Sequence, residues 1–496
     1  MNKKVGKILT AAAAGAAVGV AVKKLQDSRK EKEDERIAAI EEAVMNNRDY
    51  GDRKAYLVGG GLATLAAAAY LIRDCRFPAN QITVYEGMHI LGGSNDGIGT
   101  PEQGFVCRGG RMLNEETYEN FWELFGSIPS LRQPGRSVTE EILEFDHAHP
   151  TCAKARLVDK DGNILDVKSM GFNQADRMAL LKLLMTDEKK LDNLTIQDWF
   201  KETPHIFETN FWYMWQTTFA FQKYSSLFEF RLYMNRMIFE FSRIETLEGV
   251  TRTPLNQYDS VIRPLETYLR KAGVNFRENC EVTDIDFADG PGITAKTLYL
   301  KKKVESTDDS GEESDAPAGP SYVTEEVQLD KSDICIMTNA CMTDSATLGS
   351  LYKPAPAPEK KPISGELWAK VAGKKPGLGN PEPFFTKPEE TNWLSFTVTC
   401  KGDDILKTIE NFTGNVSGSG ALMTFKDSSW LMSSVVAAQP HFVNQPADQT
   451  IFWGYGLHTE AIGDYVKKPM KDCTGQELLN EYLHHLHIPE DRIAEL

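Results

Sequence analysis

The stretch KAYLVGGGLATLAAAAYLIRD, residues 54–74, decides how the rest of the chain is interpreted. A short apolar run leads into three consecutive glycines, and an alanine-rich segment with helical character follows them. The next apolar run, ITVYEG at residues 82–87, has the length and composition of a second strand. These pieces predict a strand–turn–helix–strand unit of the βαβ type.

The glycines of this turn fit a dinucleotide-binding pattern. Gly59, Gly61 and Thr64 occupy the positions of G-x-G-x-x-[small residue], directly after a strand and at the start of a helix. Gly59 permits the tight turn, and Gly61 allows a pyrophosphate to approach the positive end of the helix. Glu86 ends the second strand, where an acidic residue commonly binds the ribose hydroxyls. The combination favours nucleotide binding over a plain tight turn, although Thr64 replaces the usual third glycine.

Two further glycine pairs favour FAD over NAD as the nucleotide. The chain continues through GMHILGGSNDGIG (87–99) to GFVCRGGRM (104–112), so a second glycine-rich turn follows the acidic residue. Extended backbone between two arginines suits a flavin ring and its phosphates, whereas an NAD enzyme needs no second cradle; hairpin turns are the alternative. The predicted cofactor-binding residues are Gly59, Gly61, Leu62, Ala63, Glu86, Gly92, Gly93, Ser94, Arg108, Gly109, Gly110 and Arg111.

The composition is that of a globular protein with more than one domain. The chain has 496 residues, 41% hydrophobic and 25% charged, and this is too long for a single hydrophobic core. The net charge of −16 argues against a nucleic-acid partner, because little basic surface is available to neutralise phosphates. The eight cysteines are scattered without a CxxC pair, which predicts reduced thiols and no metal site.

The N-terminal segment leaves several interpretations open. KILTAAAAGAAVGVAVKK (7–24) places small apolar residues between lysines, a run shorter than the ~20 residues of a membrane span. A helical extension or surface anchor is favoured, while a short membrane anchor and a cleaved signal peptide are the alternatives. We expect a cytoplasmic protein, and leave association with a membrane surface open.

Changes in composition along the chain indicate its organisation. We expect an α/β protein: a Rossmann-like FAD-binding domain with an inserted helical lid and a β-rich substrate domain. Strands are expected within 274–287, 293–304, 326–340, 392–402 and 420–439, with residues 360–384 as a connector. The expected segments are 1–50 as an extension, 51–136 and 256–350 (with an acidic loop at 304–320) as the FAD-binding domain, 137–255 as the lid, 351–450 as the substrate domain and 451–496 as the start of a C-terminal region.

Several longer motifs are shared with a known family. They are GGSNDG (92–97), FAFQKYSSLFEFRLYMNRM (219–237), NQYDSVIRPL (256–265), FTGNVSGSGALMTFKDSSWLMS (412–433), QPHFVNQP (439–446) and GDYVKKPMKDCTGQELL (463–479), together with the turns quoted above. In this order they resemble the oleate hydratases, FAD-dependent fatty-acid hydratases also called myosin-cross-reactive antigens. The resemblance extends over roughly residues 52–496.

The resemblance implies addition of water to the cis-9 double bond of a free fatty acid such as oleate, giving a 10-hydroxy acid without net redox change. Such a reaction needs a proton donor on one face of the alkene, an activated water on the other and a dry tunnel for the chain. Tyr233 matches the family's catalytic tyrosine, which is proposed to protonate the alkene. Core packing is the alternative for a tyrosine in an aromatic helical stretch.

Met112 departs from the family pattern at the second catalytic position. It directly follows Arg-Gly-Gly-Arg, where the family has the glutamate that activates water, and a thioether cannot accept a proton usefully. Three outcomes are open. In the first, the water is held only by the backbone, Asn114 and the flavin, and in the second another carboxylate takes the place of the missing one. In the third outcome the activity is weakened, altered or lost. Glu115 and Glu116 are close in sequence but are expected to point elsewhere if a helix begins near residue 114.

The resemblance also implies where the fatty-acid carboxylate binds. Thr413 and Asn415 match the family's carboxylate-binding positions, Ser419 is a further candidate, and an ordinary polar turn is the alternative. His441 is expected to be a structural hydrogen-bonding residue, and TNACMTD (338–344) to contact the cofactor. Family members continue beyond the position of Leu496 with a segment that completes the flavin site.

Two other functions remain open on the sequence alone. One is a flavin-dependent oxidoreductase or isomerase acting on an unsaturated lipid; the other is a fatty-acid- or flavin-binding protein without catalysis. Product mass separates them: a gain of water, a change in hydrogens or no change. The expected partners are an unsaturated free fatty acid and a second copy of the chain in a homodimer, with no nucleic acid. Peripheral membrane contact through YVKKPMK (465–471) is left open, a solvated surface being favoured.

Overall fold

The computed structural model describes residues 49–95, 97–109, 111–304, 321–338, 343, 345–357, 363–385, 392–419 and 422–496. The chain divides into two compact units, Met1–Arg53 and Lys54–Leu496, and the elements below belong to the second. The N-terminal apolar run, residues 305–320 of the acidic loop, Gly110 and residues 339–342 lie outside the described residues.

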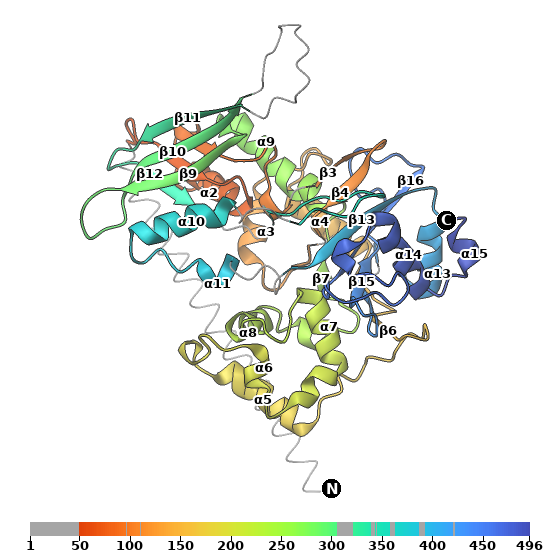
Figure 1. Cartoon of the computed structure of the whole chain (residues 1–496). Helices are drawn as coiled ribbons and strands as arrows, with labels where there is room; N and C mark the ends of the chain where they lie inside the picture. Colours follow the sequence, from red (N-terminus) through yellow and green to blue (C-terminus); the bar gives the residue numbers. More distant parts are fainter. Residues whose placement is uncertain are drawn as a thin grey trace, which may run out of the picture. The chain divides into compact units, whose positions relative to one another are not determined.

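A four-stranded parallel sheet is built around the first glycine-rich turn (Figure 1). Its strands, in spatial order, are β12 (Ile334–Met337), β1 (Ala55–Val58), β2 (Ile82–Tyr85) and β8 (Asn275–Arg277), and α2 (Leu62–Arg73) connects β1 to β2. All of β1 is buried, as expected for an inner strand of a parallel sheet covered by helices. The strand–turn–helix–strand prediction for residues 54–87 is therefore confirmed.

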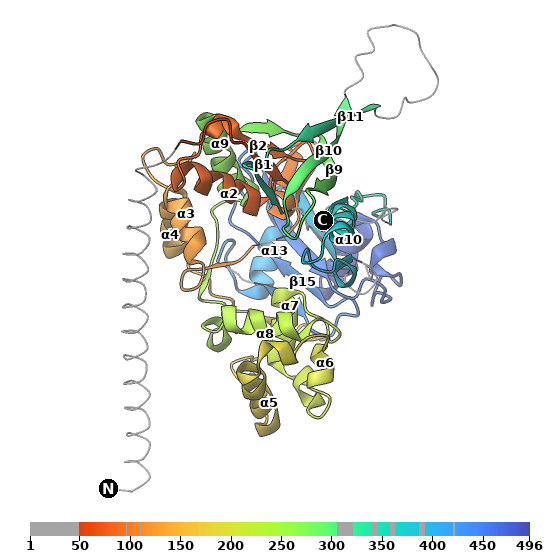
Figure 2. The same cartoon turned by 90° about the vertical axis from the view of Figure 1, so that its left-hand side faces the viewer.

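A three-stranded antiparallel sheet continues from this part of the chain. Its strands are β9 (Cys280–Phe287), β10 (Ala295–Val304) and β11 (Ser321–Gln328). Two helices pack near these sheets: α9 (Arg263–Ala272) contacts α2, and α10 (Ile363–Lys374) contacts β9. Figure 2 shows α10 beside β9.

The interpretation of residues 360–384 as a connector was wrong for α10. Leu367 and Val371 are one helical turn apart, and both are buried in the core of this sheet. Tertiary packing therefore stabilises a helix whose two glycines made it hard to predict from the sequence.

The middle of the chain is mainly helical. It contains α3 (Glu119–Gly126), α4 (Val138–Ala148), α5 (Gln174–Met185), α6 (Ile196–Trp199), α7 (Asn210–Phe219) and α8 (Leu227–Arg236). Ser137, Asn173 and Thr195 begin three of these helices with complete capping boxes. In both ribbon views α5, α6 and α8 lie together, away from the parallel sheet. The paired strands β5 (Leu113–Asn114) and β7 (Val250–Thr251) bring the two ends of this part together.

A second, five-stranded sheet is formed mainly by the C-terminal part of the chain. Its strands, in spatial order, are β13 (Leu394–Lys401), β16 (Gln449–Gly456), β15 (Met432–Val435), β14 (Met423–Phe425) and β6 (Leu157–Val158). The helices of this part are α13 (Asp404–Thr413), α14 (Gly475–His485) and α15 (Glu490–Ile493). The strands predicted within 392–402 and 420–439 are thus confirmed. A hairpin of β3 (Gly97–Thr100) and β4 (Gly104–Cys107) reaches β13, because the Phe105 N–H donates to Thr399 Oγ1 at 3.0 Å.

The largest hydrophobic core joins the helical part to the second sheet. Trp212 and Trp215 of α7, Phe230 of α8 and Trp453 of β16 are all buried in it. Phe105 of β4 belongs to the same cluster. The helical part therefore shares its core with the sheet on which the hairpin also packs.

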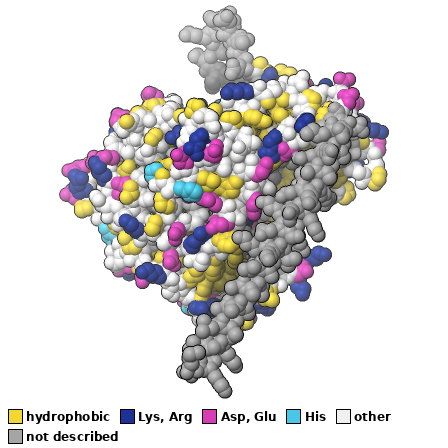
Figure 3. Space-filling model, turned by 180° about the vertical axis from the view of Figure 1, so that it is seen from behind, with side chains coloured by type: hydrophobic (Ala, Val, Ile, Leu, Met, Phe, Trp, Pro, Cys, Tyr) yellow, Lys and Arg dark blue, Asp and Glu magenta, His cyan; other side chains and the backbone are white. Residues whose placement is uncertain are grey.

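One face of the molecule carries side chains of several kinds (Figure 3). On the face drawn in Figure 3, acidic and basic side chains lie among apolar ones. Within the described residues, none of the helices combines the length and the apolar character needed to cross a membrane.

Candidate active site

The first glycine-rich turn is tied tightly to the end of β2. Gly59 has a φ of +96°, a conformation that favours glycine, and its N–H donates to the Tyr85 carbonyl at 2.9 Å. A Cβ on Gly60 would lie only 2.6 Å from Leu91 Cδ2. A Cβ on Gly61 would meet nothing within 4 Å. The turn is therefore packed at Gly60 and open at Gly61, where α2 begins, so the residues present leave room for a pyrophosphate at the helix N-terminus.

Glu86 joins this turn to the strand that precedes it. Its Oε2 accepts the Gly60 N–H at 2.7 Å, and its Oε1 accepts the Met88 N–H at 2.8 Å. The structure thus places the predicted ribose-binding carboxylate beside the turn, held in a fixed position by two backbone donors.

The second glycine-rich turn lies against the first. The Gly92 N–H donates to the Gly60 carbonyl at 2.9 Å, and Gly61 and Gly92 form an isolated β-bridge. Gly93 also approaches closely, because a Cβ on it would lie 3.4 Å from Gly61 Cα. Ser94 follows, and Leu62 and Ala63 open α2 beside this pair of turns. Local sequence predicted each turn, and the fold brings both together.

The Arg-Gly-Gly-Arg segment completes this group of predicted residues. Arg111 Nη2 donates to the Ser94 carbonyl at 2.8 Å, and Arg108 Nη1 donates to the Thr343 carbonyl at 2.6 Å. Gly109 has a φ of +146°, and a Cβ on it would lie 3.2 Å from the Trp453 ring. Gly110 lies outside the described residues. Of the predicted cofactor-contact loop (338–344), Thr338 and Thr343 are described, and the Thr338 hydroxyl hydrogen-bonds that of Thr64.

Gln257 holds this segment in place, although the sequence alone gave it no role beyond its place in a shared motif. In the amide orientation that satisfies both groups, it donates to the Gly109 carbonyl at 3.0 Å and accepts the Arg111 N–H at 2.8 Å. Gln257 is buried. Its partners lie far away in the sequence, so no local pattern distinguishes it from a surface amide.

An open cavity of about 590 Å³ adjoins these residues. Its polar lining includes Arg111, Arg252, Gln257 and His441, and its apolar lining includes Trp453. Among the described residues that line it there is no carboxylate. Burial lowers the pKa of Arg252 to about 10, although Asp146 opposes the shift, and burial lowers the pKa of His441 to about 4. The cavity therefore suits an anionic group, with His441 neutral near pH 7.

One buried donor in this cavity wall lacks a partner. The Trp453 side chain is 8% exposed, and its Nε1–H has no hydrogen-bond acceptor in the described part of the chain. A buried N–H without an acceptor is costly, so a bound group carrying an acceptor fits this position.

Tyr233 lies on α8 within an aromatic group. Its ring is 5.3 Å from that of Phe219 and 5.2 Å from that of Phe221, both edge-on, and the residue is 37% exposed. Burial raises the pKa of Tyr233, Glu229 and Tyr118 add to the rise, and Arg111 opposes it. The hydroxyl therefore keeps its proton at neutral pH and lies within electrostatic reach of the Arg-Gly-Gly-Arg segment.

Met112 is half-buried against the largest core cluster. The two acidic residues nearest to it in the sequence point to other partners. Glu115 pairs with His147 at 3.1 Å, and Glu116 pairs with Arg243 at 3.1 Å; both glutamates are exposed. The helix expected near residue 114 begins only at Glu119, and the two ion pairs rather than a helix direct both carboxylates to other partners.

The polar turn after α13 holds Thr413, Asn415 and Ser419. Thr413 Oγ1 donates to the Ile409 carbonyl at 2.8 Å, and Asn415 Oδ1 accepts the Lys154 N–H at 2.8 Å. Ser419 Oγ donates to the Val416 carbonyl at 2.8 Å. Thr413 and Asn415 line a smaller cavity of about 290 Å³, whereas Gly418 lines the larger one. The turn therefore borders both cavities, and its side-chain oxygens already stabilise the local backbone.

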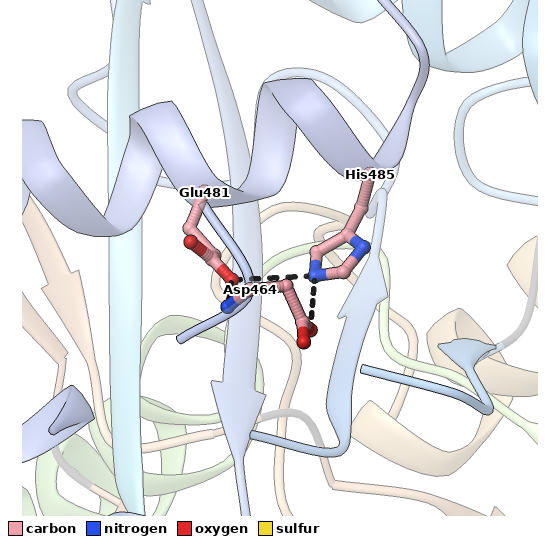
Figure 4. Close-up of side chains that lie close together, drawn as sticks. All are labelled: Asp464, Glu481 and His485. Atoms are coloured by element: carbon pink, nitrogen blue, oxygen red, sulfur yellow. Dashed lines mark hydrogen bonds and ion pairs between the residues drawn. The ribbon is translucent and has the colours of Figure 1, made fainter. Parts of the chain in front are cut away.

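A group of side chains elsewhere in the described residues has the spacing of metal ligands (Figure 4). Asp464, Glu481 and His485 place one ligand atom each within 4.8 Å of the others, and Figure 4 shows the two residues of α14 directed toward Asp464. Glu481 already accepts the backbone N–H groups of Asp464 (2.6 Å), Tyr465 (2.9 Å) and Val466 (2.7 Å). These hydrogen bonds explain why the Glu481 carboxylate is buried: it acts as a clamp that holds the loop before α14 in place.

Comparison with known proteins identifies relatives over most of the chain. The sequence pattern of the MCRA family matches residues 52–496. The chain is 39% identical over 464 residues to a linoleate hydratase of Lactiplantibacillus plantarum, covering 87% of this chain and 78% of that protein. It is 35% identical over 452 residues to an oleate hydratase of Streptococcus pyogenes serotype M49 (strain NZ131), covering 90% of this chain and 73% of that protein.

Solved structures of similar chains were also found. A CLA-producing fatty acid isomerase from P. acnes has a TM-score of 0.42 at 13% identity, covering 89% of this chain and 84% of that chain. An oxidoreductase from Methanosarcina mazei has a TM-score of 0.41 at 13% identity, covering 82% of this chain and 79% of that chain.

Proposed function

The chain belongs to the MCRA family, and on this basis we propose that it is a fatty-acid hydratase. It adds water to the cis-9 double bond of oleate or a related unsaturated fatty acid and releases a 10-hydroxy fatty acid. The observation that carries this proposal is the 39% identity to a linoleate hydratase over 87% of the chain. An oleate hydratase at 35% identity supports the same reaction.

The carboxylate of the fatty acid binds in the larger cavity. Its lining includes Arg252 and has no carboxylate among the described lining residues, which supports an anionic ligand. The turn that holds Thr413, Asn415 and Ser419 borders this cavity at Gly418, and Thr413 and Asn415 line the smaller cavity beside it. The apolar and aromatic residues of the helical part then surround the hydrocarbon chain.

Tyr233 is the general acid. Its raised pKa keeps the hydroxyl protonated, and Phe219 and Phe221 pack edge-on against its ring. The proton moves from the Tyr233 hydroxyl to one alkene carbon as the π bond breaks. The oxygen of a water molecule bonds to the other carbon, and a base takes the proton that this water loses.

The two glycine-rich turns and the Arg-Gly-Gly-Arg segment hold FAD. The open space at Gly61, the carboxylate of Glu86 and the two arginines support a dinucleotide that carries a flavin. The flavin would shape and polarise the site without exchanging electrons, since hydration of an alkene leaves its redox state unchanged. We also propose that residues 51–136 and 256–350 form the FAD-binding domain, with 137–255 as the lid over the substrate.

Met112 favours a second candidate function, a fatty-acid-binding homologue without catalysis. A thioether in place of the expected carboxylate leaves water activation to another group. If no such group existed, the fold would still bind flavin and lipid.

Mass spectrometry of the product tests these functions. Purified protein is incubated with FAD and with oleate or linoleate under reducing conditions, beside the Tyr233→Phe variant. A product that gains one water with the wild type and is absent with the variant supports the hydratase. A change in hydrogens indicates an oxidoreductase or isomerase, and an unchanged fatty acid indicates a binding protein.

A further inference from the structure

Glu240 is a buried carboxylate that is hydrogen-bonded to the side chain of Asn114, two residues after Met112. It begins a short 3-10 turn, Glu240–Ser242, seven residues after Tyr233, and is 2% exposed. Its Oε1 accepts the Asn114 Nδ2–H at 3.0 Å and also bonds Arg243 Nη2. Asn114 lies two residues after Met112, the spacing at which an extended chain returns to the same face.

One oxygen of this carboxylate is unused. Glu240 Oε2 is buried and has no hydrogen-bond partner in the described part of the chain. Burial raises the pKa of Glu240, and the Arg243 guanidinium opposes the rise. A buried carboxylate oxygen without a donor is a site for a water molecule, whose O–H would satisfy it.

The other polar groups near Met112 are occupied. The Asn114 Nδ2 donates to Glu240 and to the Gly249 carbonyl, and its Oδ1 accepts the Glu116 N–H at 3.0 Å and the Thr117 hydroxyl at 3.1 Å. Asn114 therefore has no hydrogen bond left for a reacting water. Glu115 and Glu116 are exposed and ion-paired, as described above. Among these described groups, Glu240 is the one whose acceptor without a partner is buried.

We propose that Glu240 is the general base that activates water in place of the carboxylate absent at position 112. The assignment rests on the proposed hydratase function. As the water oxygen bonds to the alkene carbon, Glu240 Oε2 takes one of its protons, while Tyr233 gives its own proton to the other carbon. After the product leaves, the proton returns from Glu240 to the Tyr233 phenolate through solvent, so the protein is unchanged over the cycle.

The central test is a loss of activity at Glu240 that a carboxylate at position 112 reverses. Glu240→Gln keeps the size of the side chain and its acceptor toward Asn114, but an amide takes no proton. We expect kcat for oleate hydration to fall by about 100-fold or more, with KM and FAD affinity unchanged. Adding Met112→Glu to this variant is expected to restore at least a tenth of wild-type kcat. A purely structural role would not be rescued by a new carboxylate two residues from Asn114.

Glu115→Gln is the matched control, because it removes an exposed carboxylate from the same stretch and should leave kcat unchanged. If Glu240→Gln does not fold, Glu240→Met with Arg243→Met removes both buried charges together and is measured with and without Met112→Glu. The assignment is overturned if Glu240→Gln, or the double variant Glu240→Met with Arg243→Met, hydrates oleate at the wild-type rate. It is also overturned if the variant folds but adding Met112→Glu does not restore its activity. A wild-type protein that binds FAD and oleate but forms no hydrated product overturns the hydratase proposal and this assignment together. An active wild type with an equally active Glu240→Gln variant overturns only the assignment.

Discussion

Gly60 and Gly61 are neighbours in one turn, but a side chain has different consequences at each. A Cβ on Gly60 would collide with Leu91 and with Glu86, whereas a Cβ on Gly61 would enter open space. In the cofactor-free protein Gly61→Ala is therefore tolerated, since the φ of −77° at this position suits alanine. With FAD present, the new methyl group would occupy the space proposed for the pyrophosphate.

We therefore predict that Gly61→Ala lowers FAD affinity at least about tenfold while the melting temperature without FAD stays within ~2 °C of wild type. Flavin absorbance and fluorescence titrations measure the affinity. Gly373→Ala is the control, because Gly373 lies in α10 with open space at its Cβ and far along the chain from the turn. Equal FAD affinity in wild type and Gly61→Ala would contradict the proposed cofactor site.

Tyr233 provides a second prediction at this scale. Tyr233→Phe removes only the hydroxyl and keeps the edge-on contacts with Phe219 and Phe221. We expect hydration to fall by about 100-fold or more, because the proton donor is lost, while oleate still binds. Product analysis together with a fatty-acid binding titration measures the two effects. Retention of wild-type kcat would assign Tyr233 to packing, the alternative that its aromatic surroundings suggest.

At the scale of elements, local chemistry explains what could be predicted from the sequence. The order of β1, turn, α2 and β2 follows from an apolar run, glycines with defined roles and an alanine-rich helix, all within one short segment. Gln257 and Glu240 could not be assigned in this way, since their partners Arg111 and Asn114 are distant in sequence. The helix α10 was missed because its stability comes from packing on β9, which outweighs the effect of its two glycines.

Glu481 shows how a single carboxylate can stabilise a whole element. Its carboxylate accepts hydrogen bonds from the backbone N–H groups of residues 464–466, and one of its oxygens lies 3.5 Å from His485 Nε2. The Glu481 side chain is 0% exposed. We predict that Glu481→Gln destabilises the protein by about 2 kcal/mol or more, because an amide matches these donors less well. Urea unfolding measures the change. Glu490→Gln is the control, since Glu490 is 80% exposed and pairs with His484 at the surface; an equal effect in both variants would contradict the prediction.

The same clamp predicts how this stabilisation depends on pH. Burial alone would raise the pKa of Glu481, but the nearby His485 side chain and hydrogen bonds from the three backbone donors lower it. A depressed pKa in the folded state contributes stability above the unfolded pKa of about 4.3, and this contribution is lost as pH falls through the folded value. The difference in unfolding free energy between wild type and Glu481→Gln should therefore be largest near pH 7 and shrink below about pH 4. A difference that grows on acidification would exclude this role.

At the scale of the whole molecule, the shared core determines how the parts unfold. The cluster that includes Trp215, Phe230 and Trp453 extends from the helical part into the second sheet. Because one buried cluster takes residues from both parts, the two parts should gain and lose their structure together. Substrate binding in the helical part would then be supported by the same packing that holds Trp453 against Gly109.

Trp215→Ala tests this coupling. Trp215 is 0% exposed and packs against Phe211 and Phe219 at ring distances of 5.4 and 4.6 Å, so its loss should cost about 3–5 kcal/mol. Although the change lies in α7, we expect hydrogen exchange to accelerate in α8 and in β15 and β16 alike. Leu181→Ala in α5, where the side chain is 52% exposed, is the control and should change stability by less than about 0.5 kcal/mol. Faster exchange confined to the helices, with the sheet as protected as in wild type, would mean that the helical part unfolds independently of the sheet that carries Trp453.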